Sequence, residues 1–150
     1  MKLRHDMLTH GVNVVTARQE DRLAGLAVAW ATQTATDRIL ICVGSQSATR
    51  GLILGSGAFG LSVLKREQLQ IARTFGRKSS RDVDKFAGLG HHAAETGSPL
   101  LDDCIAAFDC RVEAVHDQDG GSKLIVGRIV HAELNQKEAE PLLYKEEDYG

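Results

Sequence analysis

Two alternating segments near the end of this 150-residue chain place the strongest constraint on its fold. In residues 108–114, and over most of residues 124–130, apolar side chains occupy every second position. Residues 118–121 lie between them and end in two glycines, which favour a tight turn. Alternation with a period of two on both sides of a turn is typical of paired strands. We therefore predict a long antiparallel hairpin here.

Short apolar or β-branched runs predict further strands in the first half of the chain. Residues 12–17 form one such run, and a charged stretch after it reads as a turn. The other runs are residues 23–30, 39–43 and 59–64.

Two helices are expected between these strands. Residues 67–75 carry Leu69, Ala72 and Phe75 at helical spacing, and we expect this helix to end at Gly76 in a left-handed cap. A shorter helix is expected over residues 48–54. Many short strands with no regular strand–helix alternation predict a mainly β fold: an antiparallel, closed or nearly closed barrel forming a single domain over residues 1–150.

The charge balance and the apolar content exclude several classes of protein. With 18 Lys and Arg against 20 Asp and Glu, the net charge is −2, so no positive field is available to hold a nucleic acid. No run approaches the roughly 20 apolar residues of a membrane helix, and the first residues lead into no apolar signal core. We expect a cytoplasmic protein that does not contact membranes.

Cysteine and histidine give little support for a metal or disulfide framework. Cys42, Cys104 and Cys110 form no Cys-x-x-Cys pair, and we expect them to be reduced. His91 and His92 lack a further ligand at a recognisable spacing, so we expect no metal. The sequence also lacks a Gly-x-Gly-x-x-Gly motif, a P-loop and a Gly-x-Ser-x-Gly motif.

Residues 45–50 are the first candidate binding segment. Ser45, Ser47 and Thr49 lie between a predicted strand and a predicted helix, where hydroxyls either cap backbone N–H groups or hydrogen-bond an anion. Arg50 falls in the first turn of that helix, where a cation opposes the helix dipole unless an anion is bound. These residues alone leave capping and phosphate binding equally open.

Residues 77–81 form a basic loop, with an arginine at each end and Lys78 between them. A solvated surface loop is the favoured interpretation, because basic loops are common and isolated surface charges contribute little.

The order of the segments resembles that of the flavin reductase-like domain family. Motifs such as Asp84-Lys85-Phe86-Ala87-Gly88 and Thr96-Gly97-Ser98-Pro99-Leu100-Leu101 match in order and spacing. The matching segments are residues 11–18, 25–37, 45–49, 56–64, 67–76, 84–88, 96–101, 126–130 and 141–144. This resemblance covers nearly the whole chain and implies an FMN-binding split barrel, a homodimer with one FMN per chain near the subunit interface.

The resemblance also assigns roles to individual residues. The residues that would run along the edge of the isoalloxazine ring are Trp30, Ala31, Thr32, Gln33 and Thr34. Those that would approach the ribityl chain and the phosphate are Ser45, Ser47, Thr49 and Arg50, with Lys85 supplying charge near the phosphate.

The chain departs from the family at several of these places. Ala27 and Ala29 stand where members often carry hydroxyl residues, and Ala35 and Arg38 stand where Ser and Pro are frequent. Fewer side-chain hydrogen bonds to the flavin are therefore expected. Ser122 occupies the position of a histidine that the family links to nicotinamide binding.

We accordingly expect an FMN-dependent oxidoreductase of the flavoredoxin kind, which transfers electrons through the flavin with no side chain acting as acid or base. The electron donor would be NAD(P)H or a protein. Two alternatives remain: an NAD(P)H:flavin reductase that supplies reduced flavin to a partner, and a flavin-binding module without catalysis.

Overall fold

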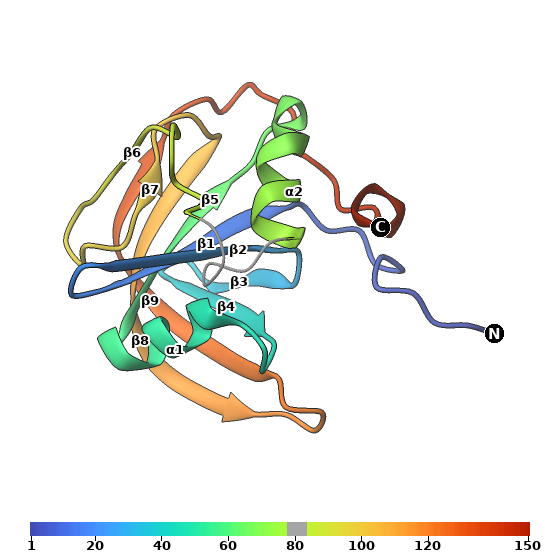
Figure 1. Cartoon of the computed structure of the whole chain (residues 1–150), viewed down its shortest axis with the longest axis horizontal. Helices are drawn as coiled ribbons and strands as arrows, with labels where there is room; N and C mark the ends of the chain where they lie inside the picture. Colours follow the sequence, from blue (N-terminus) through green and yellow to red (C-terminus); the bar gives the residue numbers. More distant parts are fainter. Residues whose placement is uncertain (78–83) are drawn as a thin grey trace.

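The computed structural model of the protein describes residues 1–77 and 84–150 (Figure 1). Most of the predicted basic loop over residues 77–81 lies outside the described residues. The strands are β1 (Asn13–Gln19), β2 (Arg22–Val28), β3 (Ala31–Ala35), β4 (Arg38–Val43), β5 (Ala58–Val63), β6 (His91–His92), β7 (Leu100–Leu101), β8 (Ala106–Asp117) and β9 (Lys123–Leu134). The helices are α1 (Ala48–Ser56) and α2 (Leu69–Arg77), with short 3-10 turns η1 (Arg66–Gln68) and η2 (Glu146–Tyr149).

Seven of the strands form one antiparallel sheet in the order β2-β1-β5-β8-β9-β4-β3. The predicted hairpin is confirmed as β8 and β9, whose turn contains Gly120 and Gly121 with φ of 90° and 92°. β2 and β3 stand at opposite ends of this order, although only Ala29 and Trp30 separate them in the chain. The Trp30 carbonyl accepts a hydrogen bond from Cys42 N at 3.0 Å. These two residues thus join the two edges of the sheet, and the mainly β barrel prediction is confirmed.

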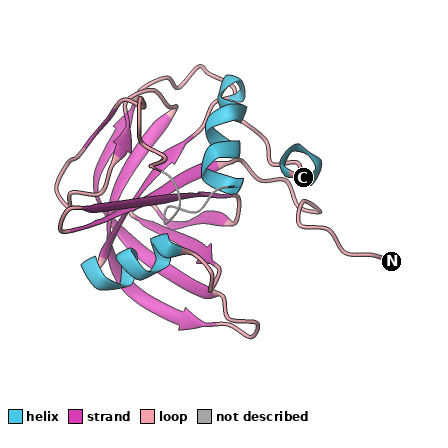
Figure 2. Ribbon diagram, viewed as in Figure 1, coloured by secondary structure: helices cyan, strands magenta, loops and turns pink. Residues whose placement is uncertain are grey.

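β1 is apolar on both faces because it lies between two cores. Val15 and Ala17 belong to the core that the sheet shares with α1, which contributes Leu52 and Ile53. Val12 and Val14 belong to a second core, which includes Ala72 and Phe75 of α2. The two helices accordingly lie at well-separated places around the sheet (Figure 2). A continuous apolar run in a strand is what burial on both faces requires.

Both predicted helices form, but their ends differ from the prediction. α1 runs beyond residue 54 and ends at Gly57, which takes the left-handed conformation (φ 73°) and donates its N–H to Ile53 O at 2.8 Å. The left-handed cap predicted at Gly76 is wrong, because α2 continues through that residue to Arg77. A Cβ on Gly76 would lie 3.4 Å from Tyr149 Cδ1, an ordinary van der Waals contact, so the ring of Tyr149 packs beside this residue.

A cluster of His and acidic side chains ties the small β6–β7 sheet to the end of β9. His92 Nδ1 lies 2.5 Å from Asp102 Oδ1, and its Nε2 lies 2.8 Å from Glu133 Oε2. His131 Nε2 contacts the same carboxylate at 2.9 Å. The hydrogen bond to Asp102, followed by the one to Glu133, raises the pKa of His92, because both stabilise the protonated ring.

We predict that His92→Gln destabilises the protein more at pH 6 than at pH 9. A raised pKa in the folded state adds stability that is fully present below the ordinary histidine pKa and is lost as pH rises through the folded-state value. Because the ring is partly exposed, we expect a loss of about 0.5 to 1 kcal/mol at pH 6, or roughly 1 to 4 °C in Tm. Thermal unfolding at the two pH values measures it. The exposed His116 supplies the control variant His116→Gln, and a loss independent of pH would contradict the assignment.

Candidate functional site

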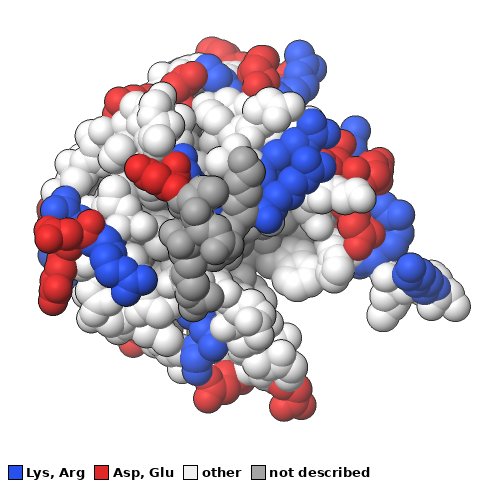
Figure 3. Space-filling view, viewed as in Figure 1, with Lys and Arg blue, Asp and Glu red and all other residues white. Residues whose placement is uncertain are grey.

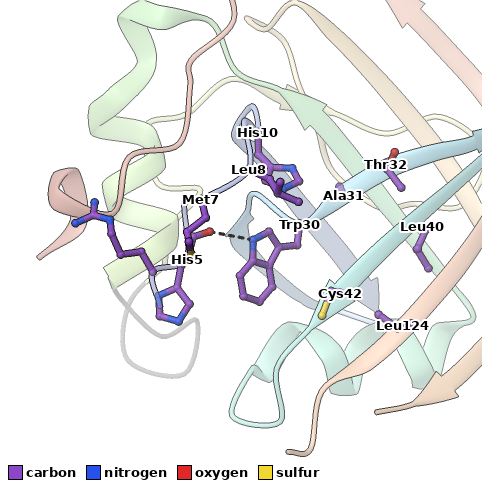
Figure 4. Close-up of a pocket in the computed structure, with 11 residues that line it drawn as sticks. His5, Met7, Leu8, His10, Trp30, Ala31, Thr32, Leu40, Cys42 and Leu124 are labelled. Atoms are coloured by element: carbon purple, nitrogen blue, oxygen red, sulfur yellow. Dashed lines mark hydrogen bonds between the residues drawn. The ribbon is translucent and has the colours of Figure 1, made fainter. Parts of the chain in front are cut away.

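An apolar hollow lies beside Trp30, at the junction of the two sheet edges (Figure 4). It has a volume of about 420 Å³. The lining residues are Arg4, His5, Met7, Leu8, His10, Trp30, Ala31, Thr32, Leu40, Cys42 and Leu124. Trp30 is 45% exposed here, and Met7 and Leu8 are exposed as well. We call this the first hollow.

The N-terminal segment forms one wall of the first hollow and is fixed in two ways. Trp30 Nε1 donates to His5 O at 3.3 Å, and the two rings lie 5.7 Å apart (Figure 4). Arg4 pairs with Asp6 at 2.9 Å and with Glu147 at 3.1 Å, while His5 Nδ1 lies 2.8 Å from a carboxylate oxygen of Glu146. The Arg4 guanidinium lowers the pKa of Asp6 to about 2. The two ends of the chain therefore hold each other beside Trp30.

A second hollow of about 310 Å³ shares His5, Trp30 and Cys42 with the first. Its other lining residues are Leu26, Ala27, Val28, Ala29, Gly44 and Tyr144. Gly44 is directly followed by the 45–50 segment that leads into α1. We call the two hollows together the groove; it extends from the apolar surface beside Trp30 toward the start of this helix.

At the start of α1, the structure gives Ser47 a capping role. Its Oγ accepts the Arg50 N–H at 3.3 Å, and no acidic residue occupies the first turn. The Arg50 side chain reaches the β8–β9 turn, where Nη1 donates to Gly121 O at 2.7 Å. A Cβ on Gly121 would lie 3.3 Å from Ser45 Oγ, so this turn packs closely on the segment. Capping uses only one N–H group, and the other N–H groups of the first turn lack acceptors within the helix.

The residues predicted to edge a ring occupy the Ala29 and Trp30 link and β3. Trp30, Ala31 and Thr32 line the first hollow, and Gln33 lines a neighbouring depression of about 150 Å³. Thr34 is exposed on β3. β3 was not predicted as a strand, because its sequence, Ala-Thr-Gln-Thr-Ala, is polar and has no buried face.

Lys85 lies in a different environment from residues 45–50. It is 7% exposed, and its Nζ donates to Gly25 O at 2.9 Å and to Phe75 O at 3.1 Å. The ammonium also lies 5.6 Å from the centre of the Phe75 ring. Burial lowers the pKa of Lys85 to about 8. Its charge is thus placed between β2 and the C-terminal end of α2.

Sequence reasoning did not identify the two chain ends and Cys42 as parts of the groove. Met7, Leu8 and His10 precede any predicted element, and Tyr144 follows the last one. The available signal was the presence of apolar and aromatic residues in segments with no strand or helix pattern. Without the folded structure, these residues cannot be assigned to a binding site.

Within residues 1–77 and 84–150, no group of three or more His, Cys, Asp or Glu side chains is arranged to hold a metal ion. Across the same described ranges, no helix is both long and apolar enough to cross a bilayer.

Comparison with known proteins gives a consistent result. The model of the flavin reductase like domain family matches residues 3–150. The reductase subunit HsaB of a flavin-dependent monooxygenase from Mycobacterium tuberculosis is 32% identical over 143 residues, covering 93% of this chain and 74% of that protein.

Solved structures agree in fold. An FMN-binding protein from Thermus thermophilus, with bound p-hydroxybenzaldehyde, is 26% identical and superposes with a TM-score of 0.86 over 96% of this chain and 86% of its own. Flavoredoxin from Methanosarcina acetivorans is 19% identical and shares the fold, with a TM-score of 0.87 over 100% of this chain and 88% of its own. The family model spans almost every residue that builds the barrel and the groove, so this chain belongs to the flavin reductase like domain family of oxidoreductases.

Proposed function

We propose that this protein binds one FMN per chain in the groove and works as a flavoredoxin-like electron-transfer flavoprotein. One observation carries the proposal. The groove extends from an apolar hollow beside Trp30 toward the hydroxyl-bearing start of α1, with Arg50 adjacent. The apolar and anion-binding surfaces therefore follow one another in the order in which a ring, a ribityl chain and a phosphate are joined in FMN.

The first hollow suits the isoalloxazine ring. Its apolar side chains, among them Leu40 and Leu124, would pack on the ring faces. The exposed residues of β3, Thr32, Gln33 and Thr34, together with Trp30 and Ala31, would present backbone groups to the ring carbonyls and to N3. Two-electron and one-electron chemistry is what the flavin itself supplies when bound. The role of the protein is to bind the ring, orient it and exclude water from one of its faces.

The start of α1 suits the phosphate. Free first-turn N–H groups and the positive end of the helix dipole favour an anion, and Ser45 and Ser47 would add hydroxyl donors. Thr49 is only 1% exposed, so it would support the phosphate site from the buried side of this turn. Arg50 has five N–H donors, and Gly121 O takes one of them. Lys85 would act through its charge, since its ammonium is already bound to two carbonyl oxygens.

We predict that the protein takes up FMN stoichiometrically and binds it on the order of ten to a hundred times more tightly than riboflavin. Each charge-assisted hydrogen bond to the phosphate is worth about 1.5 to 3 kcal/mol, which riboflavin cannot gain. Arg50→Gln should reduce this preference without abolishing riboflavin binding. Arg111→Gln is the matched control, because Arg111 is an exposed arginine on β8. Fluorescence titration measures the affinity of each of the three proteins for FMN and for riboflavin, and equal affinity of the unmodified protein for the two ligands would refute the phosphate site.

We further propose a homodimer in a reducing, cytoplasmic compartment. Trp30, Met7 and Leu8 expose apolar surface around the first hollow, and a two-fold partner would cover both this surface and the open face of the flavin. Cys42, Cys104 and Cys110 are free thiols, which supports a reducing environment.

The dimer is tested by sedimentation of the flavin-loaded protein at micromolar concentration. We expect a mass near twice the 16.3 kDa of one chain. A monomer that still holds FMN tightly would contradict the dimer.

A second candidate function is an NAD(P)H:flavin reductase that supplies reduced flavin to a partner, and the similarity to the HsaB reductase subunit favours it. Ser122 argues against it. Its short side chain stands in the β8–β9 turn and offers neither ring area nor an imidazole to hold a nicotinamide. Hydride transfer needs the donor carbon about 3 to 3.5 Å from the flavin, and the rate depends steeply on that geometry.

We therefore predict slow, non-saturating reduction of the bound flavin by NADH or NADPH in stopped-flow mixing, with rapid reduction by dithionite. Dithionite serves as the control, because it shows that the flavin is accessible and reducible. Fast, saturable bleaching by either nicotinamide would refute the carrier and establish the reductase.

A further inference from the structure

His10 is the one ionisable side chain of the first hollow that lacks a partner among residues 1–77 and 84–150. Arg4 and His5, which line the same hollow, pair with acidic residues of the two chain ends, and Cys42 Sγ lies 4.0 Å from Gln118 Oε1. Figure 3 shows acidic and basic side chains close together where the two ends meet. The His10 ring therefore has both of its nitrogens available to a ligand in a mostly apolar hollow.

The backbone around His10 is fixed by the C-terminal segment. Tyr144 N donates to His10 O at 2.8 Å, and Val12 N donates to Leu142 O at 2.9 Å. The side chain of His10 is partly buried, and Figure 4 shows that it comes to the hollow from a different segment than Trp30 does. A backbone held in this way keeps the imidazole at the hollow.

The position of His10 selects one part of the flavin. His10 lines the first hollow but not the second, which leads toward the start of α1. In the proposed function, the first hollow receives the isoalloxazine ring and the start of α1 receives the phosphate. The described lining of the first hollow contains no Asp or Glu, so negative charge that develops on a ligand there meets no lining carboxylate.

We propose that His10 is a flavin-binding residue, whose imidazole hydrogen-bonds the isoalloxazine ring and, when protonated, stabilises the reduced ring. This inference rests on the proposed function, because it requires a flavin in the groove, and it adds a residue that the sequence did not single out. The ring presents carbonyl oxygens and nitrogens as acceptors, and an imidazole has an N–H to donate in either protonation state.

The charge of His10 would act on the reduction potential. In the two-electron reduction of a flavin at neutral pH, the donor supplies two electrons, solvent supplies one proton, and the ring is left with one negative charge. An imidazolium beside the ring favours this charged form, and His10 keeps its own proton throughout. The other titratable groups around the hollow are Arg4, His5, Cys42 and the carboxylates of Asp6, Glu146 and Glu147. Because these groups are the same in every variant of His10, a comparison between variants isolates the imidazole.

The test compares the unmodified protein with His10→Phe, which keeps a ring without nitrogens, and with His10→Gln, which keeps a neutral donor. His116→Phe is the matched control, because His116 is an exposed histidine of β8 that lines neither hollow. Fluorescence titration gives the affinities for FMN, riboflavin and lumiflavin. The midpoint potential of bound FMN is measured at pH 7 and at pH 9, and Tm is measured on the flavin-free proteins.

We expect His10→Phe to weaken the binding of all three flavins about three- to tenfold, as the loss of one hydrogen bond requires. Lumiflavin is included because it has the ring without the ribityl chain. His10→Gln should lower the midpoint potential at pH 7 by about 15 to 20 mV, which is roughly a three- to fivefold change in the relative affinity for reduced flavin at 29.6 mV per tenfold. At pH 9 this difference should vanish, because a histidine is then neutral. His116→Phe should change none of these affinities, and the flavin-free Tm of the His10 variants should be unchanged.

An unchanged lumiflavin affinity in His10→Phe would overturn the inference, while a preference of the unmodified protein for FMN over riboflavin would leave the proposed function standing. A difference in potential of equal size at pH 7 and pH 9 would refute the role of the charge. A flavin-free Tm several degrees lower in both His10 variants would show that the ring has a partner within the protein instead. If the unmodified protein binds no flavin, the proposed function fails, and this inference fails with it.

Discussion

The rest of the structure depends on the two-residue link between β2 and β3. Ala29 and Trp30 carry the chain from one edge of the seven-stranded sheet to the other, so the barrel closes at this point. The Trp30 carbonyl is held by Cys42 N, and its indole is held by the N-terminal segment. The groove lies beside this closure, and Trp30 lines both of its hollows.

The sequence was sufficient to predict those strands and helices whose burial produces a local pattern of apolar residues. The alternation in β8 and β9, the apolar run of β1 and the spacing of Leu69, Ala72 and Phe75 each report which faces are buried. The end of α2 was mispredicted for a nonlocal reason. Gly76 reads as a cap in sequence, but the helix continues through it to Arg77, whose guanidinium donates to the carbonyl oxygens of Asp148 and Tyr149 in the C-terminal turn. β3 escaped prediction because an exposed polar edge strand has no burial pattern to detect.

In the candidate site, too, some residues could be identified from local sequence, whereas other contacts required the fold. Residues 45–50 could be singled out because hydroxyls before a helix have a known chemistry. The predicted partnership of Lys85 with that segment came from family position, whereas the fold gives its ammonium two backbone carbonyls as partners. The contacts of Arg50 with Gly121, and of the Arg4 segment with the C-terminal turn, join residues far apart in the chain. Contacts of this kind leave no periodic pattern in the sequence of either segment. They can therefore be identified only in the folded structure.

The strand order also determines when this protein can fold during its own synthesis. β9 lies between β8 and β4, yet it is the last strand to be made. Until the ribosome has released residues 123–134, the β3–β4 hairpin has no partner on its inner edge, and the barrel interior stays open to water. At about 5 to 20 residues per second, that interval lasts several seconds, during which an apolar edge is available to other chains. A nascent chain stalled within this interval would be a natural client for a chaperone.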